Sequence, residues 1–263
     1  MDFLALQDGY PTIQEFETLQ NDALYQELCQ YSDTFVEKNP QAFGYYKTKW
    51  GDNPVRHWSR QWEYPFIYQR VNAFLKPKSG EPLSVFDAGS GLTFMPHYFC
   101  HLYENLNVEC GDSDQQTCAD AQGLNPPGSE RARYSVQDIK KTTFADAQFD
   151  LVYCISVLEH CGNPTEIIHE FARVLKPGGR LVLTIDISFD GNKDIAPHLA
   201  AKMIQLLETQ FTPDADYISM LKKFHPQQHL TTNYIKEKYP ERTPWQPPYF
   251  FSLSVFGMCF VKK

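Results

Sequence analysis

The fold of this chain is decided by the stretch Leu83-Ser84-Val85-Phe86-Asp87-Ala88-Gly89-Ser90-Gly91. It begins as a short apolar run typical of a buried strand, and it ends in an acid followed by a glycine-rich turn. A helix is expected next, because Pro96 is tolerated in the first turn of a helix. Glycines let a ligand approach the backbone closely, and a helix N-terminus offers free N–H groups. Strand, turn and helix together therefore suit a nucleotide-like ligand.

Outward from this stretch, strands and helices alternate. We predict further strands at 107–110, 134–136, 149–154, 181–187 and 250–261, and helices at 164–175 and 195–207. Asn163 is expected to cap the first of these helices, and Pro177-Gly178-Gly179 to stop it. This alternation predicts an α/β protein with an open sheet of βαβ units. Such sheets bind ligands beyond the carboxyl ends of their strands, where Asp87, Asp112 and Asp138 are expected.

The first eighty residues differ from the rest of the chain. Apolar residues recur at helical spacing within 24–35 and 65–76, and no clear strand precedes residue 80. We therefore divide the chain into a helical cap, residues 1–80, and a sheet domain, residues 81–263.

An aromatic segment lies between the two predicted cap helices. It carries Trp50, His57, Trp58, Trp62 and Tyr64. The favoured interpretation is that most of these side chains pack the cap onto the sheet. The alternative is an aromatic lid that contacts a planar or cationic substrate. The stretch 211–248, which has little periodicity, is the second candidate for a substrate wall.

Composition narrows the class of protein. The 263 residues include 24 Lys and Arg against 32 Asp and Glu, a formal charge of -8. An acidic balance argues against a nucleic-acid partner, because phosphate binding needs clustered Lys and Arg. No apolar run approaches the roughly 18 to 20 residues of a membrane span. Residues 1–4 lack the start of a signal peptide, and the seven scattered Cys indicate reduced thiols, so we expect a cytoplasmic protein.

The turn differs from the dinucleotide fingerprint in two ways. That fingerprint is G-x-G-x-x-G, and its glycines hold a pyrophosphate. Here the third glycine is absent, with Thr93 in the turn, and the strand ends in Asp87. A carboxylate there would repel a pyrophosphate but could receive a cationic amino group. Asp112 lies 23 positions after Gly89, close to the roughly 20 expected of an acid that binds a ribose.

Five motifs in the correct order give the chain a resemblance to the class I S-adenosylmethionine-dependent methyltransferases, from about residue 83 to 188. In chain order, the five motifs are Val85 to Gly91, Asp112, Asp138 with Ile139, Phe149 to His160, and Arg173 to Gly179. The resemblance implies a Rossmann-like fold, with about seven strands of which the last is antiparallel. It also implies S-adenosylmethionine as the methyl donor.

The resemblance also implies the site residues. Gly89, Ser90 and Gly91 would contact the cofactor, with Asp87 facing its methionine end. Asp112, with Ser113 beside it, would bind the ribose. The remaining cofactor contacts are Asp138 and Ile139 at the adenine, and Cys154 and Ile155 through their backbone. Each role has a purely structural alternative. Asp138 would instead form a turn, and Asp112 would instead cap a helix.

His160 is the candidate catalytic residue, as a base or an acceptor-orienting group after the fourth strand. A helix-capping or structural role is its alternative. Some quinone-pathway members of the family carry Glu-x-x-Glu-His here and bind a metal. Ser156 replaces the first Glu in this chain, so no metal is expected.

The leading hypothesis is an enzyme that methylates a small molecule on oxygen, nitrogen or carbon. Methyl transfer from a sulfonium needs alignment of the reactants, and a base only where the acceptor arrives protonated. Two alternatives remain. One is an NAD-dependent oxidoreductase on a related fold, and the other is a non-catalytic scaffold that binds the cofactor. The acceptor, the pathway and the oligomeric state stay open.

Overall fold

The structure is a computed structural model that describes the chain except residues 1–2, 51–52, 79, 125–128, 191–194 and 241–251, and the side chains of residues 49, 50 and 129. The described residues form one seven-stranded sheet in the order β3-β2-β1-β4-β5-β7-β6. Its strands are β1 (Leu83–Ala88), β2 (Leu106–Asp112), β3 (Ala132–Val136), β4 (Phe149–Ile155), β5 (Leu175–Ser188), β6 (Phe211–Pro213) and β7 (Leu253–Lys262).

The sheet is mainly parallel. β1 pairs in parallel with β2 and β4, β2 with β3, and β4 with β5. β7 inserts antiparallel between β5 and β6. The Rossmann-like fold and the antiparallel last strand are thus confirmed. Because the parallel strands share a direction, β1 to β4 all end at the same edge of the sheet.

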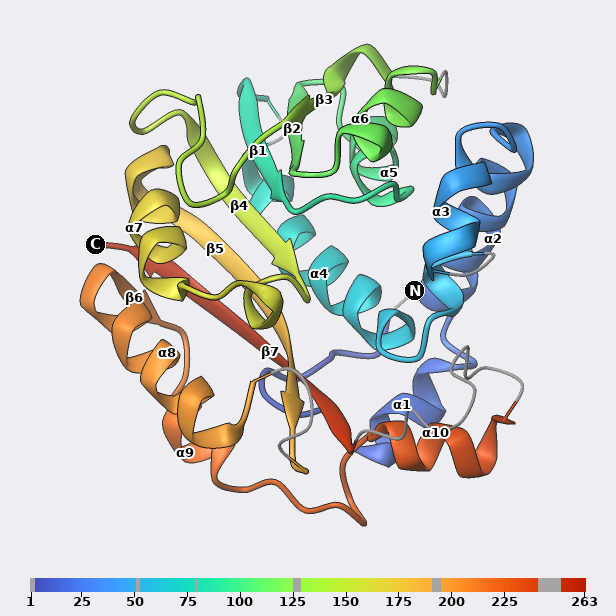
Figure 1. Ribbon diagram of the computed structural model, residues 1–263, viewed down its shortest axis with the longest axis vertical. Helices are drawn as coiled ribbons and strands as arrows, with labels where there is room; N and C mark the ends of the chain where they lie inside the picture. The colour runs from blue at the N-terminus through green and yellow to red at the C-terminus, as the bar shows by residue number, and fades with distance from the viewer. Residues whose placement is uncertain (1–2, 51–52, 79, 125–128, 191–194, 241–251) are drawn as a thin grey trace.

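Helices cover both faces of this sheet. They are α1 (Ile13–Leu19), α2 (Ala23–Lys38), α3 (Phe43–Trp50), α4 (Arg60–Leu75), α5 (Met95–Leu102), α6 (Gln115–Gln122), α7 (Pro164–Val174), α8 (Pro197–Gln210), α9 (Tyr217–Leu221) and α10 (Thr232–Lys238). Figure 1 shows α7 and α8 side by side against β4, β5 and β7, and α4 on the other side of these strands. Neighbouring strand residues separate accordingly: Val85 and Tyr153 join the core beneath α4, and Phe86 and Cys154 the core beneath α7.

The best-predicted helix ends earlier than its stop signal. Asn163 caps α7 by accepting from the Thr165 N–H at 3.2 Å, as expected. The helix ends at Val174, however, and β5 begins at Leu175. Pro177-Gly178-Gly179 therefore lies inside the strand, where the pairing with β4 shifts register. Gly178 has φ +73°, so the stop signal forms an irregularity in the strand and not its boundary.

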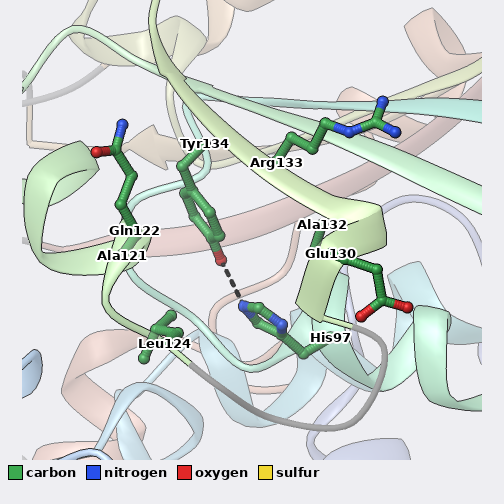
Figure 2. Close-up of a pocket in the computed structure, with 8 residues that line it drawn as sticks. All are labelled: His97, Ala121, Gln122, Leu124, Glu130, Ala132, Arg133 and Tyr134. Atoms are coloured by element: carbon green, nitrogen blue, oxygen red, sulfur yellow. Dashed lines mark hydrogen bonds between the residues drawn. The ribbon is translucent and has the colours of Figure 1, made fainter.

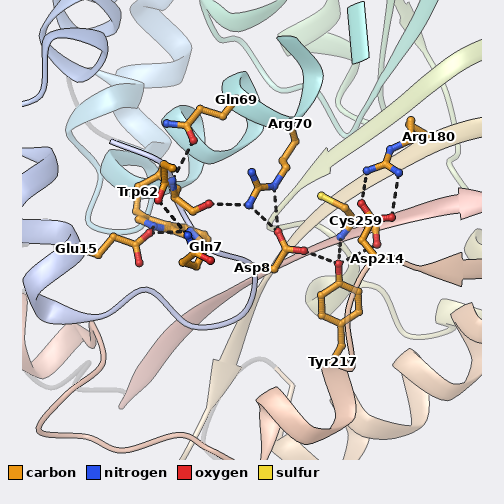
Figure 3. Close-up of polar contacts among 12 residues, drawn as sticks. Gln7, Asp8, Glu15, Trp62, Gln69, Arg70, Arg180, Asp214, Tyr217 and Cys259 are labelled. Atoms are coloured by element: carbon orange, nitrogen blue, oxygen red, sulfur yellow. Dashed lines mark hydrogen bonds and ion pairs between the residues drawn. The ribbon is translucent and has the colours of Figure 1, made fainter. Parts of the chain in front are cut away.

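The N-terminal region packs directly onto the last strand. A Cβ placed on Gly257 of β7 would lie 2.7 Å from Trp62 and 2.8 Å from Phe66, both on α4. Gly9 exchanges two backbone hydrogen bonds with Gly257, at 2.8 and 2.9 Å. Beside it, Asp8 accepts from Arg70 and from the Tyr217 hydroxyl, each at 2.8 Å (Figure 3). The cap is therefore joined to the sheet by packing and by hydrogen bonds.

The aromatic segment is largely buried. Trp58 and Trp62 have no exposed surface, and Tyr64 is 1% exposed. Trp62 also donates to Glu15 at 3.0 Å (Figure 3). The interpretation that most of these side chains pack the cap is thus confirmed for these three. Trp50 lies outside the described side chains.

Candidate functional site

The glycine-rich turn after β1 forms an open cradle. Gly89 and Gly91 have φ +72° and +55°, a region that favours glycine, and the N–H groups of Gly89 and Ser90 both donate to the Gly111 carbonyl. A Cβ placed on Gly91 would meet no atom within 4 Å. The hydroxyl oxygen of Ser90 is buried and has no hydrogen-bond partner among the described residues. Empty space above Gly91 and an unsatisfied buried hydroxyl together indicate room for a polar ligand.

Asp112 at the end of β2 turns toward this cradle. Its Oδ2 accepts from the Gly91 N–H at 2.8 Å, and its Oδ1 accepts from the Asp114 N–H at 2.9 Å. Each carboxylate oxygen keeps a further lone pair for a ligand hydroxyl. The structure thus brings the turn and the expected ribose-binding acid together at one edge of the sheet.

Asp87 is a buried carboxyl group beneath the turn. It is 3% exposed, and its Oδ2 accepts from the Tyr153 hydroxyl at 2.9 Å. Burial raises the pKa of Asp87 to about 8, against the lowering effect of that hydrogen bond. The group is therefore largely protonated at neutral pH, and a cationic partner would favour its ionised form. Tyr153 was not predicted as a partner of Asp87. Only its place on the neighbouring strand β4 brings it there.

The remaining predicted cofactor residues differ in exposure. Asp138 is exposed and accepts from the Lys140 N–H at 3.0 Å, which is the turn-forming arrangement named as its alternative. Ile139 is 8% exposed. The Gln137 N–H donates to the Asp112 carbonyl at 2.8 Å, so the segment after β3 lies next to the end of β2. Ser113 is exposed, Cys154 is buried and Ile155 is half-buried.

The segment after β4 packs against the cradle. A Cβ on Gly89 would lie 2.6 Å from Val157, so only glycine fits beside this segment. The next turn, η4 (Leu158–His160), exposes the predicted His160 to solvent and half-buries Glu159. Oε1 of Glu159 accepts from the Asp186 N–H at 2.8 Å, while Oε2 is buried and has no hydrogen-bond partner among the described residues. Sequence reasoning passed over Glu159 in favour of its neighbour.

A buried ion pair from the cap reaches the same edge. Glu63 of α4 has no exposed side-chain surface and pairs with Arg60 one turn earlier. It also accepts from Ser156 at 2.6 Å and from Thr184 of β5. Ser156 has φ +47°, an uncommon conformation for a residue with a side chain. The pair lowers the pKa of Glu63, so an ionised carboxylate fixes α4 over the ends of β4 and β5.

A second contact from the cap lies near Asp112, the acid predicted to bind the ribose. The Tyr45 hydroxyl of α3 donates to Oδ2 of Asp114 at 3.1 Å. Asp114 caps α6 through the Thr117 N–H at 3.0 Å. The cap therefore borders the candidate site on two sides, at α6 and at β4–β5.

One described cavity lies apart from this edge. It measures about 260 Å³ and lies near the start of β3, between α5 and α6 (Figure 2). His97 and the Tyr134 hydroxyl are 3.1 Å apart on its wall. Burial lowers the pKa of His97 to about 4, so this imidazole is neutral. None of the predicted site residues lines the cavity.

The described part of the chain shows neither a group of metal ligands nor a helix suited to a membrane. No three His, Cys, Asp or Glu side chains are grouped so that they could hold a metal ion. None of its helices combines the length and the apolar character needed to cross a membrane.

Comparisons with known proteins match the part of the chain that contains the glycine-rich turn and Asp112. Residues 86–183 match the family model described as Methyltransferase domain. A Xanthomonas oryzae protein named ubiquinone biosynthesis O-methyltransferase is 42% identical over 57 residues, which cover 21% of this chain and 24% of that protein. A Campylobacter curvus protein named tRNA U34 carboxymethyltransferase is 23% identical over 51% of this chain and 46% of its own. The matched segments span less than half of these curated relatives.

Solved structures share the fold at low identity. A Galdieria sulphuraria structure assigned as a sarcosine dimethylglycine methyltransferase has a TM-score of 0.57 and 14% identity, covering 85% of this chain and 98% of that one. A phospholethanolamine N-methyltransferase from Haemonchus contortus, solved with S-adenosylhomocysteine, has a TM-score of 0.54 and 17% identity. It covers 88% of this chain and 60% of that one. These likenesses support the fold.

Proposed function

We propose that this chain, whose residues 86–183 match the Methyltransferase domain family model, binds S-adenosylmethionine and methylates a small-molecule acceptor. The observation that carries the proposal is the contact between Gly91 and Asp112. It places an open glycine cradle beside a carboxylate with lone pairs to spare. A nucleoside joined to an amino acid needs both features, because ribose hydroxyls seek an acid and the amino-acid part needs close backbone approach.

The residues of the edge fit the cofactor. Asp112 would accept from the ribose hydroxyls, and the cradle at Gly91 would receive the methionine part. The buried Ser90 hydroxyl would find its missing partner there. Asp87 would meet the cationic amino group, which favours its ionised form. Asp138, Ile139 and Ser113 would border the adenine and ribose, and the backbone at Cys154 and Ile155 would complete the wall.

Bound S-adenosylmethionine would supply a methyl group on a positively charged sulfur. The contribution of the chain is then to hold and align the acceptor and to exclude water. The cap does this in our proposal, because Glu63 fixes α4 over the ends of β4 and β5. Alignment of this kind contributes roughly 7–11 kcal/mol to lowering a barrier.

A small acceptor is favoured over a nucleic acid. The chain carries a formal charge of -8, and the edge presents the half-buried carboxylate of Asp112. A phosphate backbone needs the opposite field. The relative that acts on tRNA makes bulk tRNA the necessary comparison in the test.

The experiment is isothermal titration with S-adenosylmethionine, followed by transfer of a tritiated methyl group to a metabolite pool and to bulk tRNA. We expect binding in the micromolar range and label in the small-molecule fraction. Absence of binding at millimolar concentration would contradict the proposal. Binding without transfer to either pool would indicate the non-catalytic scaffold instead. Quenching of NADH fluorescence by the protein would indicate the oxidoreductase.

A further inference from the structure

Glu159 lies in the segment that packs on the glycine turn, and its carboxylate reaches the end of β5. Val157 packs on Gly89, and Glu159 follows two residues later in the turn η4. The Asp186 N–H holds Oε1 at 2.8 Å, which fixes the orientation of the carboxylate at the end of β5. The second oxygen, Oε2, is buried and has no donor among the described residues. Leaving such a charged oxygen unsatisfied is costly, so a donor from a ligand is expected there.

Among the described groups, His160 lowers the pKa of Glu159 by its charge, but it is exposed to solvent. Arg60 of α4 is partly buried, and it is already paired with Glu63 on its own helix. Burial and Arg60 lower the pKa of His57 on the same side to about 3, so its imidazole is neutral. Asp186 is 8% exposed and adds a further carboxyl group. The field at Oε2 therefore selects a cationic donor and disfavours an anion.

The pKa of Glu159 also suits the transfer of a proton to and from a bound ligand. Burial, with a smaller contribution from Glu63, raises its pKa to about 7, against the lowering effect of His160 and of the Asp186 N–H. Cys154 of β4 and Cys161 are titratable groups that also interact with it. A carboxyl group with a pKa near neutrality can accept a proton and release it again.

Resting on the proposed function, we propose that Glu159 binds the acceptor and that the acceptor is an amine. The ammonium group donates to Oε2 of Glu159, which supplies the donor that this oxygen lacks. Proton transfer then makes the nucleophile. One N–H bond breaks, its electron pair stays on nitrogen, and the proton goes to Oε2, so that Glu159 becomes a neutral carboxylic acid. His160, which is exposed, is not needed for this step.

The first test needs neither the cofactor nor activity. Ethanolamine, ethylene glycol and glycolate have the same two-carbon skeleton and differ in charge, and all three are small enough to enter an acceptor site. By isothermal titration we expect ethanolamine to bind at least tenfold more tightly than the other two. Glu159→Gln should weaken it at least tenfold. Glu166→Gln, the same change at an exposed residue on α7, should leave it unchanged.

The outcomes are decisive in both directions. Equal binding of ethylene glycol, no binding of ethanolamine, or unchanged binding by Glu159→Gln would overturn the proposal. If Glu159→Gln does not fold, as judged by circular dichroism, Glu159→Asp takes its place. This variant keeps the charge but withdraws it by one methylene, and at least a threefold loss of affinity is expected.

The second test separates this proposal from the function it rests on. Amines, alcohols and carboxylates with matched carbon skeletons are offered with tritiated S-adenosylmethionine. Methylation of amines alone, lost at least 100-fold in Glu159→Gln with cofactor binding intact, supports the proposal. Methylation of an alcohol or a carboxylate, or of none of the three classes while the cofactor binds, overturns the amine assignment and not the cofactor site. Failure to bind the cofactor overturns the proposed function itself.

Discussion

The backbone N–H of Gly91 donates to Oδ2 of Asp112 at 2.8 Å, across the ends of two neighbouring strands. This contact orients the carboxylate before any ligand arrives. The same carboxylate accepts from the Asp114 N–H, so the acid is fixed from two directions. A ligand that uses Asp112 therefore loses little freedom of that side chain on binding.

Asp112→Asn should weaken binding of S-adenosylmethionine roughly 10- to 100-fold, because a hydrogen bond to a charged group contributes about 1.5–3 kcal/mol. Isothermal titration measures the change. Asp120→Asn on α6 is the matched control, since Asp120 contacts Gln116 of its own helix. Equal affinities for the two variants would remove Asp112 from the site.

Gly91→Ala tests the cradle against backbone strain. The methyl group would enter the open space that the proposal gives to the cofactor, and φ +55° costs a residue with a side chain about 1–2 kcal/mol. Gly178→Ala provides the control, because Gly178 has φ +73° and open space but lies at the opposite end of β5. Urea unfolding should show similar losses for both, while only Gly91→Ala should lose cofactor affinity. A similar loss of affinity in both would attribute the effect to strain.

Asp87 should make the stability of the ligand-free protein depend on pH. Its pKa is raised from 3.8 to about 8, so the folded state holds a proton that the unfolded state has released. Stability should therefore be greatest near pH 4 and fall as the pH rises toward 8, by up to about 1.4 kcal/mol per pH unit. Asp87→Asn removes this dependence, and urea unfolding at pH 5 and pH 7.5 measures it. Tyr153→Phe removes a contact that lowers the pKa, so the fall should extend to higher pH.

Glu63→Gln should destabilise the protein by about 3–5 kcal/mol, because Arg60 would be left as a partly buried charge without a counterion. Chemical unfolding gives the value. Asp33→Asn provides the comparison, because its partner Arg56 is exposed and such pairs contribute about 0–1 kcal/mol. The double variant Arg60→Met with Glu63→Gln should recover part of the loss. A loss below 1 kcal/mol for Glu63→Gln would mean that the pair does not hold the cap.

The strands of the sheet domain could be predicted from the sequence because the residues that determine them lie close to them in the chain. The strand that ends in Asp87, the positive-φ glycines and the Asn163 cap all lie within a few residues of what they determine. The core strands were therefore found to within a few residues of their ends, except that β5 begins six residues before the predicted start at Leu181. β6 was missed because three residues carry no readable periodicity, and α1 and α3 because both are short.

The contacts that shape the candidate site are long-range. Tyr153 and Asp87 are 66 positions apart, and Ser156 and Glu63 are 93 apart. No local pattern pairs a strand tyrosine with a particular acid, or a cap glutamate with a serine after β4. The choice of His160 over Glu159 had the same origin, since only the fold shows which of two adjacent side chains turns inward.

The pairing of Gly9 with Gly257 has a consequence for synthesis of the chain. The two residues are joined by two hydrogen bonds but lie 248 positions apart. At about 5–20 residues per second, the ribosome takes roughly 12–50 seconds to cover that interval. During this time the segment around Gly9, and the α4 face that rests on Gly257, have no partner. Nascent copies of this protein are therefore expected to be most in need of chaperones just before β7 emerges.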